Sequence, residues 1–231
     1  MRINPVRALR RHTQEAASLD IEPTLKRFIL RSQPNINPKY RSMERLYRSL
    51  AESCGDDLLH VSSDLQLFMT AWALSPGHAL LPSDTKVLMP LAEILRLEEV
   101  SALRDCDPVR LTDAAIQRTI IKTVADIQKF LRDQGICGPI DDDAVATTIL
   151  WGSTACVLPY DPFVRKGMRL LSLSPDSLSV AGLRTIASYW ENNKSAFERA
   201  SLLLSDKGLH DAPLYALAIY VRQLGEEHLG L

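Results

Sequence analysis

The sequence has few of the residues on which several structural and functional classes depend. Its 231 residues include 10 glycines and only 14 aromatic side chains, whereas an all-β sandwich needs regular turns and strands rich in rings. Four scattered cysteines form no C-x-x-C pair, which favours buried reduced thiols over two disulfide bridges. Five histidines form no ligand spacing, so no local pattern indicates a metal, and we expect no cofactor.

Long uncharged stretches suited to a membrane are also lacking. The stretch 65–83 contains Pro76, Gly77 and Pro82, which prevent one continuous spanning helix. The stretch 144–160 carries several threonines and indicates a buried helix of a soluble protein. The first eleven residues are positively charged without an apolar core behind them, unlike a secretory signal. We therefore expect a soluble, cytoplasmic chain with no membrane partner.

Charge is unevenly distributed along the chain, although the formal net charge is only −1. Residues 1–50 contain nine arginines and two lysines against four acidic side chains, so this segment is strongly basic and the remainder acidic. Arginine binds phosphate and carboxylate equally well in a bidentate manner. The segment can therefore be a phosphate-binding face or a surface docked on an acidic one. The arginines that we expect to be exposed are Arg7, Arg10, Arg11, Arg27 and Arg31, of which the first three are candidate nucleic-acid contacts.

The spacing of apolar residues predicts helices throughout. Between Thr112 and Gly135 apolar side chains recur every three or four residues, and Gly135 marks the end of that helix. Ser179 is the expected N-cap of another helix, with a break at 192–194. Asp211 and Pro213 open a last helix that Gly225 is expected to close.

No segment alternates apolar and polar residues as a strand does. The prediction is a single compact all-α domain of at least seven helices, with a basic helical segment at 1–50 and a helical core domain at 51–231. The expected core includes Trp72, Ile120, Val124, Ile127, Leu150, Ile186 and Leu217.

One segment, residues 141–166, carries chemical interest. Three aspartates at 141–143 precede a run at 144–158 that is nearly all apolar or small, which predicts a buried helix with an acidic cap. After a short turn, Asp161 and Pro162 have the order of an N-cap and a first helical residue.

This segment resembles the catalytic-aspartate region of the helix-hairpin-helix DNA glycosylases. Asp161-x-x-Val164-x-Lys166 is similar to the V-D-T-H-V-x-R pattern of that superfamily, with lysine in place of arginine. The resemblance implies a glycosylase-like fold, a catalytic role for Asp161 and phosphate contacts by Arg165 and Lys166. No lysine of the segment stands where bifunctional members carry their amine nucleophile. Trp72, Tyr160 and Trp190 are candidates either for stacking on a nucleotide or for the core.

A wider part of the chain resembles an uncharacterised group of bacterial all-helical proteins. The similar residues are Thr70-Ala71-Trp72 with Gly77, Ile149-Leu150-x-Gly152, Cys156-Val157-x-x-Tyr160-Asp161 and Leu224-Gly225. This resemblance implies the fold and its extent, without an activity.

Three functions remain open on the sequence. The first is a DNA-binding, glycosylase-like helical protein, whose partner is DNA. The second is a non-enzymatic helical module for protein interaction or regulation, whose partner is another protein. The third is an enzyme of another kind, although G-x-S-x-G, G-x-x-x-x-G-K-[ST], G-x-G-x-x-G and H-E-x-x-H are all missing.

Overall fold

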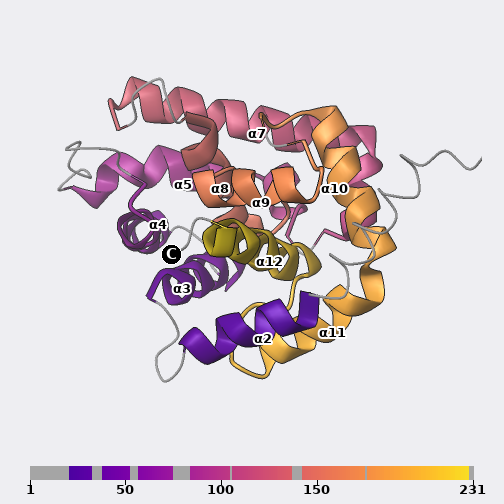
Figure 1. Cartoon of the computed structure of the whole chain (residues 1–231). Coiled ribbons are helices and arrows are strands. Elements are labelled where there is room, and N and C mark those ends of the chain that lie inside the picture. The colour runs from indigo at the N-terminus through magenta and orange to yellow at the C-terminus, as the bar shows by residue number, and fades with distance from the viewer. Residues whose placement is uncertain are drawn as a thin grey trace, which may run out of the picture.

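The computed structural model describes residues 21–32, 38–52, 57–74, 84–104, 106–136, 142–174 and 176–228. The predicted contacts Arg7, Arg10 and Arg11 lie outside these residues, as does Asp141. The regular secondary structure of the described residues is helical, with no strand (Figure 1). This confirms the predicted all-α class. Among the described residues, no helix combines the length and the apolar composition needed to cross a bilayer.

Eleven α-helices and two short 3-10 helices follow one another in the described part of the chain, which confirms the prediction of at least seven. The α-helices are α2 (Ile21–Ser32), α3 (Pro38–Glu52), α4 (Leu58–Ala71), α5 (Met89–Arg96), α6 (Glu98–Ser101), α7 (Ala114–Asp133), α8 (Asp142–Thr154), α9 (Pro162–Leu170), α10 (Val180–Asn192), α11 (Lys194–Ser205) and α12 (Pro213–His228). The 3-10 helices are η1 (Thr85–Leu88) and η2 (Pro108–Thr112).

Most helix ends lie where the sequence places them. The Ser179 hydroxyl accepts a hydrogen bond from the Gly182 N–H at 3.1 Å and so caps α10. Gly135 follows α7 with a left-handed φ of 63°, as a C-terminal glycine should. A single residue, Asn193, separates α10 from α11. The exception is Gly225, because α12 continues through it as far as His228.

The predicted long helix of the 141–166 segment is shorter than expected. Its helical part, α8, ends at Thr154, and the residues from Ala155 to Tyr160 are buried without being helical. Ala155 has a left-handed φ of 53°, which turns the chain out of the helix without a glycine. Two side chains of the acidic first turn join α8 to α7, since Arg132 donates to Asp142 at 2.7 Å and Gln128 to Asp143 at 2.6 Å.

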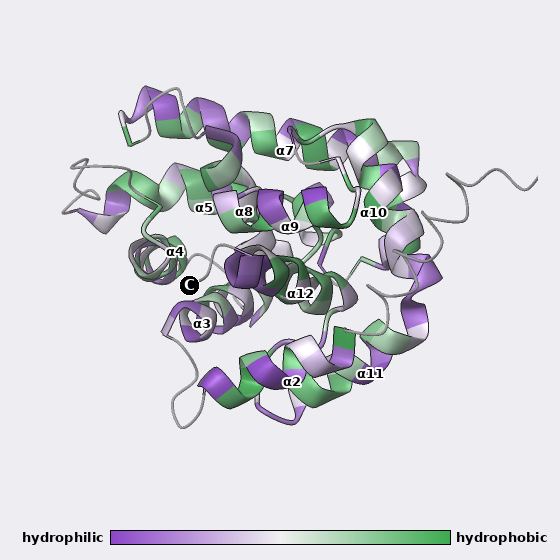
Figure 2. Cartoon of the chain, viewed as in Figure 1, coloured by the Kyte–Doolittle hydropathy of each residue, from purple (hydrophilic) through white to green (hydrophobic). Residues whose placement is uncertain are grey.

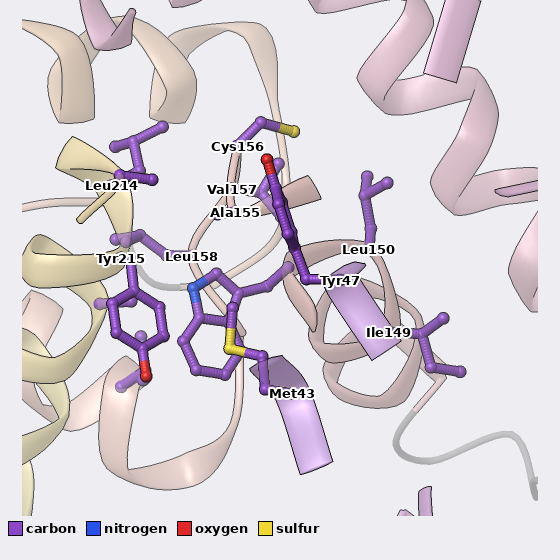
Figure 3. Close-up of a cluster of buried hydrophobic side chains, with 14 of the residues drawn as sticks. Met43, Tyr47, Ile149, Leu150, Ala155, Cys156, Val157, Leu158, Leu214 and Tyr215 are labelled. Atoms are coloured by element: carbon purple, nitrogen blue, oxygen red, sulfur yellow. The ribbon is translucent and has the colours of Figure 1, made fainter. Parts of the chain in front are cut away.

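A single hydrophobic cluster connects the helices, and α12 lies at its centre, with α2, α3 and α11 on one side and α8, α9 and α10 on the other (Figure 1). Along the helices α2 and α7, hydrophilic and hydrophobic residues recur in alternation, as is typical of amphipathic helices at a protein surface (Figure 2). Side chains from α3, α8, the 155–158 segment and α12 converge in the core (Figure 3). All seven residues of the predicted core are buried.

A chain of aromatic rings runs through this core from α2 to α12. It passes from Phe28 to Tyr40, Trp72, Trp151 and Tyr215, with successive ring centroids 5.0–5.5 Å apart. The contacts are edge-on except for the last pair, which is stacked at an interplanar angle of 12°. Such pairs add roughly 0.5–1.5 kcal/mol each beyond the burial of their area. The rings therefore fix α2 and α3 on the rest of the core.

The helices α9 and α12 approach each other very closely, and two glycines allow this contact. A Cβ on Gly167 of α9 would lie 1.9 Å from the Val221 carbonyl oxygen of α12. A Cβ on Gly225 of α12 would lie 1.9 Å from the Phe163 carbonyl oxygen of α9. Gly225 therefore serves as a contact between helix backbones rather than as a helix end.

We predict that Gly225→Ala destabilises the protein by about 3 kcal/mol or more, because the methyl group must push two backbones apart. Gly182→Ala is the matched control, since its Cβ would lie 3.3 Å from the Ser179 hydroxyl and touch no backbone. This control should stay within about 1 kcal/mol of the wild type. Urea unfolding measures both variants, and equal stabilities would show that the close contact is not required.

Candidate functional site

Asp161 begins α9 as its N-cap, in agreement with the prediction. One carboxylate oxygen, Oδ1, accepts hydrogen bonds from the N–H groups of Phe163 at 2.8 Å and Val164 at 3.0 Å. Pro162 takes the first helical position, where its missing N–H is not needed. The local sequence thus fixes one carboxylate oxygen, Oδ1, at the N-terminus of α9.

The other oxygen of Asp161 forms an ion pair with Arg222, which comes from α12. The Asp161 and Arg222 side chains are only 16% and 11% exposed, respectively. Nε of Arg222 also donates to Glu226 at 2.8 Å. The guanidinium lies between two rings, 5.4 Å from the centroid of Trp72 and 4.8 Å from that of Phe163. Arg222 therefore balances the charge of Asp161 and holds its position.

A cavity of about 220 Å³ opens beside this pair, and we call it the Asp161 cavity. The start of α3, the end of α4 and the start of α9 meet there with the first turns of α8 and with Arg222 of α12. Its polar lining residues are Lys39, Thr148, Asp161 and Arg222, and the remainder are Trp72, Ala73, Leu74, Ala144, Val145, Pro162 and Phe163. The cavity thus combines apolar walls with a few charged groups, which is typical of ligand sites.

Lys39, in the first turn of α3, supplies the amine of the Asp161 cavity. Its Nζ lies 5.6 Å from the centroid of the Trp72 ring, and its carbonyl oxygen accepts the indole N–H at 3.0 Å. Burial lowers the pKa of the Lys39 ammonium, Arg222 lowers it further, and Asp161 and Glu226 oppose this. A lysine with a lowered pKa in a cavity is typical of a functional amine.

The structure brings only some of the predicted site residues together. Arg165 and Lys166 lie partly exposed on α9, and the described lining of the Asp161 cavity does not include them. Tyr160 and Trp190 are buried in the core and are not among the lining residues of the cavity, which agrees with the second role considered for them, that of core residues. Trp72 forms a wall of the cavity while it is only 7% exposed.

Two residues of the site are absent from the sequence prediction. Arg222 carried a signal, since it is the lone charge in the largely apolar stretch 214–225 and stands at the helical spacing of the inner face. A charge at such a position predicts a buried partner. Lys39 carried no comparable signal, because it looks like any lysine in the first turn of a surface helix.

A second cavity, of about 550 Å³, lies over the outer face of α3, and we call it the arginine cavity. Its basic lining residues are Arg41, Arg45, Arg48, His60 and Lys207, and its acidic ones are Glu44, Glu52 and Asp64. Glu44 accepts the backbone N–H of His210 at 2.7 Å. Burial raises the pKa of Glu44 to about 7, while this hydrogen bond and Arg48 oppose the rise.

The chain was compared with protein-family models, curated proteins and solved structures, and none of them matches it. The resemblance of the Asp161 segment to the glycosylases therefore stays a prediction. Among the described residues, no three histidine, cysteine or acidic side chains gather in a group suited to a metal ion. Cys106 and Cys156 are free and buried.

Because Asp161 pairs with Arg222 in addition to capping α9, its replacement by asparagine should lower the stability of the fold more than a change of cap alone. As a cap alone, Asp161→Asn would leave stability within a few tenths of a kcal/mol. Replacing the carboxylate by an amide removes one of the two negative charges that pair with the buried Arg222. We therefore predict that the free energy of unfolding falls by about 2 kcal/mol. Asp113→Asn is the control, because the exposed Asp113 caps α7 through a single bond to the Ala115 N–H at 2.8 Å. Equal urea midpoints for the two variants would contradict a structural role for the ion pair.

A second prediction concerns the pH dependence of stability. The raised pKa of Glu44 means that the folded state holds a proton that the unfolded state releases between about pH 4.5 and 7. Stability should therefore fall as pH rises through this window and level off above it. Relative to Glu44→Gln, the wild type should lose on the order of 2 kcal/mol after allowance for solvent screening. Urea unfolding from pH 4.5 to 8 measures this, and parallel curves for the two proteins would contradict it.

Proposed function

We propose that this chain is a DNA-binding helical protein that takes one nucleotide into the Asp161 cavity and acts on its glycosidic bond. The observation that carries the proposal is that Lys39 and Asp161, far apart in sequence, both line one small cavity. The resemblance of the Asp161 segment to the helix-hairpin-helix glycosylases agrees with this function.

The size and the lining of the cavity support a single nucleotide as the ligand. A volume of about 220 Å³ is comparable to that of one nucleoside. Leu74, Val145 and Phe163 present apolar surface to the cavity, while Lys39 and Asp161 provide charge. Enzymes that act on a base bind it in this way, extrahelically and between apolar side chains.

The partly buried position of Lys39 in the cavity makes it the reacting group. Burial and the Arg222 guanidinium lower the pKa of the Lys39 ammonium and so increase the fraction of neutral amine, while Asp161 and Glu226 oppose this effect. The lone pair of that amine forms a bond to C1′, and the bond from C1′ to the base breaks. The base leaves with the electron pair and takes a proton from the amine. The sugar ring then opens by transferring the remaining amine proton to O4′, which leaves an imine on Lys39. Asp161 stabilises the positive charge that develops on C1′.

Reductive trapping tests this function. The full chain is incubated with a DNA duplex that contains an abasic site, whose aldehyde forms the same imine, in the presence of borohydride. We expect a covalent protein–DNA adduct with the wild type and none with Lys39→Gln.

Lys194→Gln provides the matched control for this experiment. Lys194 also lies over an indole ring, 5.4 Å from the centroid of Trp190, but it is exposed and does not line the cavity. Its replacement should leave the adduct unchanged. Adduct formation that is equal in the two variants, or absent with the wild type, would overturn the proposed function.

One observation favours the second candidate, a helical protein-interaction module. Arg27 and Arg31 are exposed as predicted, but Arg27 donates from two nitrogens to Glu227, at 3.2 and 3.3 Å. This arginine therefore joins α2 to α12 instead of being offered to a phosphate. An interaction module predicts DNA binding that is negligible at every salt concentration.

A further inference from the structure

The arginine cavity lies on a helix that also lines the Asp161 cavity. Arg41, Arg45 and Arg48 stand on α3 at spacings of four and three residues, which places them on one helical face over roughly 10 Å. Lys39 is only two residues before Arg41. Both cavities therefore adjoin the first turn of α3.

Arg45 is held in place by a buried carboxylate. Asp64 of α4 is 1% exposed, and its Oδ1 lies 2.5 Å from Nε of Arg45. Its Oδ2 lies 3.4 Å from Nε2 of His60. Neither contact has the angles of a hydrogen bond, so the contact with Arg45 is an ion pair. The buried charge of Asp64 orients Arg45 and leaves the outer part of its side chain exposed.

The remaining charges of the arginine cavity sum to an excess of cations. Arg41, Arg48 and Lys207 are exposed, and within the described part of the chain none of the three forms a salt bridge. Of the carboxylates, Glu52 is exposed, while Glu44 is half-buried and already accepts a backbone N–H. The ligand that fits this cavity is therefore an anion, and phosphate is one of the two anionic groups that arginine pairs with bidentately.

We infer that the arginine cavity binds the phosphate groups of a DNA strand. The cations follow a line along α3 instead of converging on a point, which suits a row of phosphates better than one small ion. Along the duplex axis, a length of roughly 10 Å covers about three base steps at ~3.4 Å each, so the row can reach two or three phosphates of one strand. This inference rests on the proposed function, since it assigns the backbone contacts that accompany the nucleotide in the Asp161 cavity.

A salt series on duplex DNA tests the inference. The affinity of the full chain is measured by fluorescence anisotropy between 50 and 200 mM salt, for the wild type and for the double variant Arg41→Gln/Arg48→Gln. Each lost phosphate contact should reduce the slope of log affinity against log salt by about 1, so we expect a slope smaller by about 2. The control is Arg118→Gln/Arg184→Gln, which removes two exposed arginines of α7 and α10 and should leave the slope unchanged.

The outcomes separate this inference from the proposed function. If the wild type binds and both double variants give the same slope, the inference is wrong and the proposed function stands. If the slope falls only in the α3 variant while no adduct forms on Lys39, the inference stands and the proposed function is wrong. Absence of salt-dependent binding by the wild type overturns both.

Discussion

The close approach of α9 and α12 is the constraint on which the site depends. Two helix backbones lie so near that neither Gly167 nor Gly225 has room for a Cβ. This contact places the first turn of α9, with Asp161 at its start, directly against the part of α12 that carries Arg222. The wall of the cavity, its carboxylate and its guanidinium are therefore positioned by packing of main chain on main chain, which is more rigid than contact between flexible side chains.

Arg222 makes this arrangement specific. A guanidinium that is only 11% exposed loses most of its hydration, a cost that the two carboxylates and the two rings around it offset. These partners come from α4, α9 and α12 itself, so a rotation of α12 about its axis would leave the charge buried and unpaired. We infer that the ion pair selects one orientation of the central helix among several that its apolar surface would allow.

Local signals in the sequence were sufficient for the helices and for several of their ends. The apolar periodicity of α7, the caps Asp161 and Ser179, and the glycine after α7 all appear in the structure as expected. Gly225 was misread because a glycine after an apolar run looks the same whether it ends a helix or receives a neighbouring backbone. The buried segment after Thr154 was misread because an apolar run fits a buried helix and a buried extended chain equally well. The cavity itself joins α3, α4, α8, α9 and α12, and no local pattern in one sequence reports such long-range contacts.

The position of α3 between two cavities has a thermodynamic consequence. The Trp72 indole N–H holds the Lys39 carbonyl, while Asp64 of the same neighbouring helix holds Arg45, so α3 is attached to α4 at both cavities. A ligand that displaces α3 relative to α4 in one cavity changes the free energy of occupying the other. Such coupling is reciprocal, so occupancy of the arginine cavity must alter affinity at the Asp161 cavity by the same factor as the reverse. The packing of α3 on α4 is thus the physical path by which ligands of the two cavities, as proposed above, would be coupled.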